Sequence, residues 1–204
     1  MRVTVLAVVL LLTGGCVGDL ERNAPEPAVY VLTPPAAATG AALAADLLVL
    51  RPVAAPPLRT DRIATRLDAN HMDYYAGARW GGELGTVVQS ALVESLRAAG
   101  RFRTVEAEPG QFRATHVLGV EVSRLEADYS SGAVPVARVT LTATVARYRD
   151  RQALASWTAT VEEAAAANTL TAVTAALDRA FGSAAAGLVA RAADTVSGDL
   201  AGQP

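Results

Sequence analysis

The sequence has one cysteine, no lysine and two histidines among its 204 residues. A single cysteine excludes an intramolecular disulfide and a cysteine-based metal site. All 18 basic residues are arginine, and with so many alanines this indicates a compositional bias of the genome, from which no function follows. The formal net charge of −2, without any basic patch, argues against nucleic acid as a partner.

Signatures of catalysis are also missing. The chain contains no G-x-S-x-G, no phosphate loop ending in Gly-Lys-Ser/Thr and no H-E-x-x-H. His71 lies in a polar turn and His116 opens an expected strand, so a solvated and a structural role are predicted for them. Four glycines precede an expected helix, but their spacing fits no nucleotide fingerprint: Gly77, Gly81, Gly82 and Gly85. We therefore predict a protein that is not an enzyme and holds no cofactor or metal.

The first sixteen residues indicate export. Arg2 precedes an apolar run at 3–12, and three small residues lead to Cys16. The run is too short for a membrane-spanning helix, which needs about 20 residues, but it has the length of a secretory signal. We predict that 1–15 is a lipoprotein signal peptide and that Cys16 carries a palmitate-type lipid anchor. The alternative is a secreted protein with a free thiol, which an oxidising compartment disfavours.

The first half of the expected domain alternates strands with one strong helix. Residues 16–27 are a polar, proline-bearing tether, and the alanine-rich segment 34–46 is either a loop or a weak helix. Helical spacing of apolar residues from Trp80 to Ala99 predicts a helix from about 80, ended by Gly100 in the left-handed conformation. Strands are expected at 28–32, 47–53, 61–67 and 72–75.

The second half reads as a strand, a meander and a long helix. Strands are expected at 102–107, 114–128, 136–148 and 153–162, the third with a clear alternation of apolar residues and threonine. Asn168 is the expected N-cap of a final helix, and 199–204 is expected to be a frayed tail. This order predicts one α/β domain over 28–198: a sandwich with a mixed, largely antiparallel sheet and two main helices packed on it.

Arginine and aromatic residues gather between 59 and 80. Surface charge and ordinary packing account for them, but Arg, Tyr and Trp also concentrate at interface hot spots, and arginine suits acidic partners or lipid headgroups. As a candidate partner-binding strip we predict Arg59, Arg62, Arg66, Tyr74, Tyr75, Arg79 and Trp80.

An ordered set of residues behind the lipobox-like site resembles the ABC-type transport auxiliary lipoprotein family, the PqiC/YmbA-like group. The resemblance covers nearly the whole mature chain, with Thr13 in the lipobox and the alanine-rich insertion at 36–46 as departures. The residues that carry it are Tyr30-x-Leu32-x-Pro34, Leu58-Arg59-Thr60-Asp61-Arg62-Ile63-Ala64-x-Arg66, Tyr74-Tyr75 and Arg79-Trp80.

The resemblance implies a fold similar to the N-terminal domain of TolB and a non-enzymatic accessory role. The implied partners are a mammalian-cell-entry (MCE) domain protein and the ABC permease and ATPase of a system that moves phospholipids or other hydrophobic molecules between the two membranes. Val17 is not the aspartate that signals inner-membrane retention, so we expect an anchor in the outer membrane, with the inner membrane as the alternative. Two other functions stay open: a carrier that itself holds an acyl chain, and an envelope hydrolase.

Overall fold

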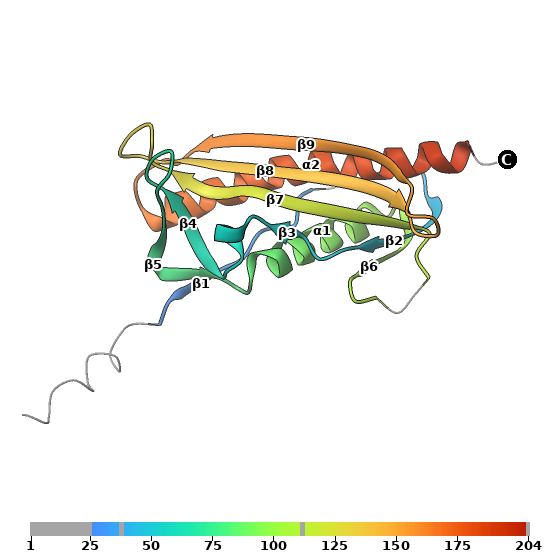
Figure 1. The fold of residues 1–204 in the computed structure, drawn as a ribbon, viewed down its shortest axis with the longest axis horizontal. Helices are drawn as coiled ribbons and strands as arrows, with labels where there is room; N and C mark the ends of the chain where they lie inside the picture. Colours follow the sequence, from blue (N-terminus) through green and yellow to red (C-terminus); the bar gives the residue numbers. More distant parts are fainter. Residues whose placement is uncertain (1–25, 37–38, 111–112, 203–204) are drawn as a thin grey trace, which may run out of the picture.

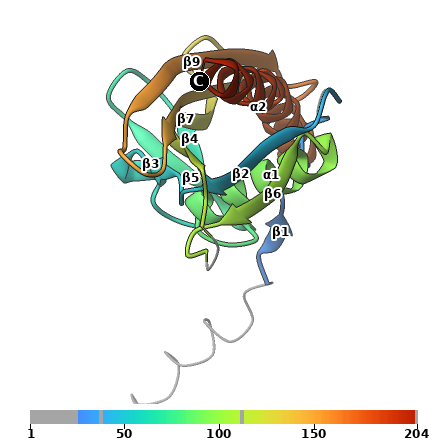
Figure 2. The ribbon, with the colours of Figure 1, turned by 90° about the vertical axis from the view of Figure 1, so that its right-hand side faces the viewer.

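The fold is a curled sheet with two helices packed against it (Figures 1 and 2). It is seen in a computed structural model that describes residues 26–36, 39–110 and 113–202, so the expected signal peptide and Cys16 lie outside the described residues. The elements are β1 (Ala28–Tyr30), β2 (Leu43–Val49), β3 (Val53–Ala54), the 3₁₀ turn η2 (Pro56–Leu58), β4 (Arg62–Arg66), β5 (Met72–Trp80), α1 (Leu84–Ala99), β6 (Phe102–Ala107), β7 (His116–Asp128), β8 (Val136–Arg147), β9 (Ala153–Ala164) and α2 (Leu170–Ala201).

Strand β7 is the strand from which the sheet branches. One edge of β7 pairs antiparallel with β8 along its whole length, and β8 pairs antiparallel with β9. The other edge pairs in parallel with β2, then β3, then β4. Outside β2 lies β6, and outside β4 lie β5 and then β1. The two long ladders are antiparallel and most short ones are parallel, which confirms the predicted mixed sheet with two helices.

The two faces of β8 differ because its sequence alternates. Four apolar side chains are buried against the core: Val139, Leu141, Ala143 and Val145. The threonines between them point outward and meet hydroxyl groups of β9 across the ladder, as in the Thr142–Thr158 contact at 2.9 Å. Cross-strand hydroxyl pairs of this kind stabilise an antiparallel ladder that has one solvated face.

Helix α2 covers the inner face of the long antiparallel ladders. It runs for 32 residues, and its buried stripe, which includes Val173, Leu177, Phe181 and Leu188, packs mainly against β8 and β9. Helix α1 packs chiefly against β6 and touches α2 as well. Figure 2 shows the curled sheet and α2 enclosing the core between them. The core is thus closed by the last element of the chain.

The helix expected from residue 80 begins instead at Leu84. Strand β5 is longer than the expected 72–75 and continues to Trp80 because its end is paired on both sides. The Trp80 N–H donates to the Asp61 carbonyl at 2.6 Å, and the next amide, that of Gly81, donates to the Tyr30 carbonyl at 2.7 Å. The end of the helix is as predicted, since Gly100 has φ of 63°.

Three further expectations need correction. Part of the alanine-rich segment is neither loop nor helix: β2 begins at Leu43, because β6 and β7 pair with its two edges, and the expected strand 47–53 divides into β2 and β3. The N-cap of α2 is Thr169, whose side chain accepts from the Ala172 N–H, whereas Asn168 accepts from the Tyr129 hydroxyl at 2.8 Å. The expected frayed tail is helical through Ala201.

Candidate functional site

Four of the predicted strip residues lie around one outer surface at the β1–β5–β4 end of the sheet. Register places Val29 of β1 beside Arg79 of β5, and Arg79 beside Arg62 of β4. Directly paired residues point to the same side of a sheet, so these three side chains form a row across the strands. We call Arg59, Arg62, Tyr74 and Arg79 the arginine strip.

Contacts hold the arginine strip in place while its charged groups stay exposed. The Arg62 guanidinium lies 4.2 Å from the centre of the Tyr74 ring, and the Tyr74 hydroxyl donates to the Pro57 carbonyl at 2.8 Å. Arg59 Nε donates to the Ala54 carbonyl at 2.9 Å, and Arg79 lies 3.6 Å from the Asp61 carboxylate. Stacked arginines keep free N–H donors for carboxylates or phosphates and lose little entropy on binding.

Exposed apolar side chains adjoin the arginine strip. Val29 and Val31 are 56% and 70% exposed. Val31 also lines a shallow groove against α1, which includes Val87 and Ala91 on its helical side. Arginine beside apolar and aromatic surface is the composition that protein interfaces favour.

Arg66 belongs to a different site, a cluster of ionic groups where β4, β7 and β8 meet. Its Nε donates to Glu126 at 2.7 Å, and Glu126, only 1% exposed, also accepts from Arg124 at 2.7 Å. Arg124 and Arg138 both reach Asp128 as well. The hydrogen bond with Glu126 raises the pKa of Arg66. We call Arg66, Arg124, Glu126, Asp128 and Arg138 the ionic cluster; it joins three strands.

Opposing effects act on the pKa of Asp128. Burial alone would raise this pKa, but hydrogen bonds from Ser130 and the nearby Arg138 and Arg124 outweigh burial and lower it. The carboxylate therefore stays charged inside the ionic cluster, as expected for a buried acid with several cationic and donor partners.

Tyr75 and Trp80, the remaining predicted strip residues, point away from the arginine strip. The Tyr75 hydroxyl meets the Tyr129 hydroxyl at 2.6 Å, and burial together with this bond raises the pKa of Tyr75. Trp80 is 2% exposed and packs in the core. Its side chain therefore has no surface to offer a partner, and its contribution is to packing. Trp80 directly follows Arg79 and so faces the other side of β5. Strict alternation would place Tyr75 with Arg79, but the register irregularity of the β4–β5 ladder and the positive φ of Gly77 interrupt it.

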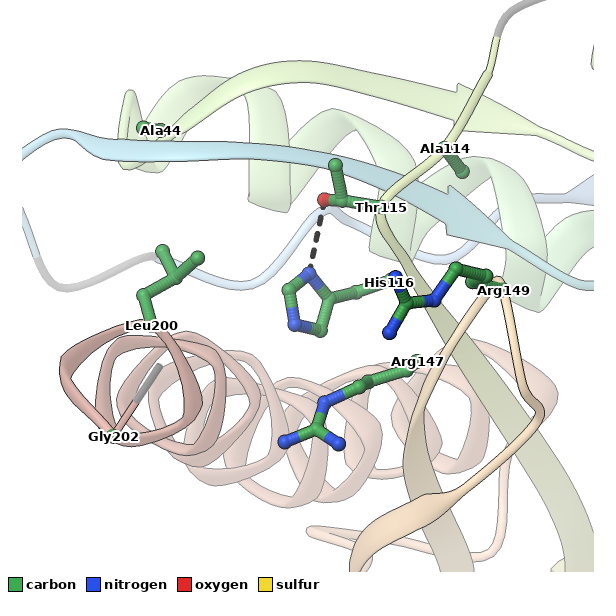
Figure 3. Close-up of a pocket in the computed structure, with 8 residues that line it drawn as sticks. All are labelled: Ala44, Ala114, Thr115, His116, Arg147, Arg149, Leu200 and Gly202. Atoms are coloured by element: carbon green, nitrogen blue, oxygen red, sulfur yellow. Dashed lines mark hydrogen bonds between the residues drawn. The ribbon is translucent and has the colours of Figure 1, made fainter. Parts of the chain in front are cut away.

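A second hollow lies at the other end of the sheet, near the C-terminus of α2 (Figure 3). It has a volume of about 690 Å³ and is lined by Ala44, Ala114, Thr115, His116, Arg147, Arg149, Leu200 and Gly202. The sequence pointed to none of these except His116. This hollow forms because the end of α2 reaches β7 and β8. The sequence predicts a frayed tail at these residues, so the hollow could not be expected from it.

His116 in this hollow has a structural role, as predicted. Its Nδ1 lies 2.9 Å from the Thr115 hydroxyl, and its Nε2 lies 3.2 Å from an oxygen of Asp199. The same carboxylate accepts from Arg147 Nε at 2.9 Å, and this pairing raises the pKa of Arg147. Through these two contacts His116 ties the end of α2 to β7.

Two other kinds of feature are absent from the described ranges 26–36, 39–110 and 113–202. They hold no group of three or more His, Cys, Asp and Glu side chains placed to bind a metal ion. Nor do these residues include a helix with the length and apolar character needed to cross a bilayer.

The curled mixed sheet with two helices defines a class of small α/β domain that is known from solved structures. Protein XCC0632 from Xanthomonas campestris has this fold, with a TM-score of 0.78 and 24% identity over 85% of this chain and 99% of its own. An uncharacterised protein has a TM-score of 0.61 with 12% identity, covering 81% and 97%. The hypothetical protein CT253 from Chlamydia trachomatis has a TM-score of 0.52 with 8% identity, covering 76% and 99%.

Residues 30–189 match the model of the ABC-type transport auxiliary lipoprotein component, and the chain belongs to this family. No functionally curated protein matches the chain. The family is an auxiliary component of transport and is not known as an enzyme family, so the chain has an accessory role in an ABC-type transport system, as a membrane-anchored lipoprotein.

Proposed function

We propose that the protein is the lipid-anchored accessory component of an MCE-type ABC system that moves phospholipids or other hydrophobic molecules between the inner and outer membranes. Cys16 would carry the anchor, in the inner leaflet of the outer membrane, with the domain facing the periplasm. The observation that carries the proposal is the arginine strip, whose guanidinium groups are exposed and held by stacking and hydrogen bonds.

The arginine strip suits docking better than catalysis. Val29 and Val31 give an apolar patch, and the arginines beside it offer paired donors to acidic groups. We therefore propose that an acidic surface of the MCE-domain protein, or of the permease that accompanies it, binds here. The patch includes Val29 of β1, the first strand of the described domain.

Charge reversal tests this proposal. The lipoprotein would be purified from membranes after crosslinking, as wild type and as an Arg62→Glu, Arg79→Glu double variant. We expect the wild type to retain an MCE-domain protein or ABC permease and the double variant to lose it. The matched control is Arg179→Glu, an exposed arginine on α2. Retention by the double variant would exclude the arginine strip as the docking surface, and a wild type without any transporter component would refute the MCE assignment.

The carrier function is the second candidate, and the hollow near His116 gives it limited support. That hollow is open to solvent and is lined by Arg147, Arg149 and Thr115, which is unsuitable for an acyl chain. Lipid profiling of the same purified material decides between the two functions. Stoichiometric phospholipid without a transporter component would favour the carrier.

Anchoring is tested separately. We expect a Cys16→Ser variant to move from the membrane fraction to the soluble periplasmic fraction. Separation of the two membranes on a density gradient then tests the outer-membrane location, and recovery of the wild type with inner-membrane markers would contradict it.

A further inference from the structure

Strand β9 is the longest edge of the sheet. It has 12 residues, whereas the edge strands β1 and β6 have three and six. Within the described part of the chain β9 pairs only with β8, so its other edge meets no strand. A long edge of free N–H and C=O groups is a ready template for another strand.

The middle of β9 lacks the features that usually block such pairing. From Ala153 to Val161 it contains no charged residue and no proline, and it is rich in residues that favour strands, such as Trp157 and Thr158. A register irregularity near Ala153 and two glutamates, Glu162 and Glu163, mark the two ends. The protection is thus confined to the ends, and the centre remains open to a partner.

The ends of β9 carry opposite charges. Arg149 and Arg151 precede the strand, and Glu162 and Glu163 close it. A second copy in antiparallel orientation would bring each basic end beside an acidic end, whereas a parallel copy would align like charges. We propose that β9 is a dimer interface, in which two copies of this chain pair their β9 edges antiparallel and extend the sheet across a two-fold axis.

Symmetry and charge together select the register. Opposed residues in an antiparallel pair share one face, so a two-fold axis perpendicular to the sheet must place one residue opposite itself. With Trp157 at the axis, Glu163 of each copy comes opposite position 151 of the other, where Arg151 lies two residues before β9 begins. A register centred on Ser156 would also set Glu163 against a basic residue, Arg149, but it would set Glu162 against Asp150, which repels. Glu162 is already paired with Arg138, which leaves Glu163 for the intermolecular contact.

A charge swap tests both the dimer and its register. The mature chain with Cys16→Ser, which keeps every described residue, would be studied by sedimentation velocity across a concentration series. We expect this chain to form a dimer, either Arg151→Glu or Glu163→Arg alone to raise the dimer Kd about tenfold or more, and the two changes combined to restore dimerisation. Arg179→Glu is the matched control and should leave the dimer unchanged. Circular dichroism melting of each variant verifies that it is folded.

Each contrary result is decisive. A chain that sediments as a monomer at all concentrations overturns the proposal, as does a dimer that both single reversals leave intact. A dimer weakened by each single reversal but not restored by the pair overturns the register centred on Trp157. None of these results bears on the arginine strip, because that surface lies on β1, β4 and β5.

Discussion

Glu126 provides the sharpest test of how the ionic cluster contributes to stability. It is 1% exposed and accepts hydrogen bonds from both Arg66 and Arg124. Glu126→Gln keeps the volume but removes the negative charge and replaces one acceptor by a donor that faces guanidinium groups. Arg124 would then keep its ion pair with Asp128, whereas Arg66 would lose the ion pair that it makes with Glu126.

The expected cost follows from burial. Removing one partner of a fully buried ion pair costs about 3–5 kcal/mol. Arg66 and Arg124 are partly exposed, so water recovers part of this, and we expect a loss of about 2–3 kcal/mol in the free energy of unfolding. For a domain of this size, 1 kcal/mol corresponds to about 2–4 °C, so Tm should fall by about 5–10 °C.

The assay is urea denaturation at pH 7 with a thermal melt, and the chain offers a matched control. Glu162 lies on the same sheet and also pairs with an arginine, Arg138, but its side chain is 49% exposed. Glu162→Gln should therefore cost less than about 1 kcal/mol. If Glu126→Gln costs no more than Glu162→Gln at an unchanged m value, burial does not strengthen this cluster and the reasoning fails.

Three more results are expected. Gly100→Ala forces a side chain into φ of 63° and should lower the free energy of unfolding by about 1 kcal/mol. Gly187 is exposed inside α2 with open space for a Cβ, so Gly187→Ala should raise that free energy by about 0.5–1 kcal/mol. Urea denaturation measures both, and a change of the same sign in the two variants would contradict this reasoning. Because the folded-state pKa of Asp128 is lowered, its contribution is complete above the unfolded pKa of about 4 and is lost as pH falls through the folded value. Below pH 4 the Tm of the wild type should therefore fall more steeply with pH than the Tm of Asp128→Asn. Parallel curves of Tm against pH for the two proteins would show that Asp128 does not contribute in this way. Trp80→Ala should cost about 3–5 kcal/mol and Arg79→Ala less than about 0.5 kcal/mol in the same denaturation assay, and similar costs would mean that Trp80 is not a core residue.

Elements with a clear period could be predicted from the sequence. Strand β8 alternates apolar residues with threonine, and α2 repeats its apolar residues at helical spacing, so neither needed knowledge of its neighbours. Strand β2 could not be found in full, because alanine has little preference for strands and Leu43 joins the sheet only through pairing with Phe102 of β6. Long-range pairing thus overrode local propensity.

The sequence predicted which residue types make up the candidate site, but not which of these residues lie together in the structure. Arg62 and Arg79 are 17 positions apart in the sequence, and only the β4–β5 register places them side by side. Arg66 has the same residue type and a similar setting, yet its carboxylate partner Glu126 lies 60 positions away on β7. Spacing along the chain carries no information about such pairings, so it could not separate the exposed arginines from the one that joins strands.

The position of α2 after every strand of the described sheet has a consequence for biosynthesis. Phe181, Leu188 and Val196 reach the core only after every strand of the described sheet has been synthesised. The last turn is then held by Asp199, which binds Arg147 and His116 on the sheet. A message that ends early therefore yields a sheet whose apolar face has no cover, and such a product should be removed by proteases instead of persisting as a partly active form. The residues of α2 thus decide whether the apolar face of the sheet is covered.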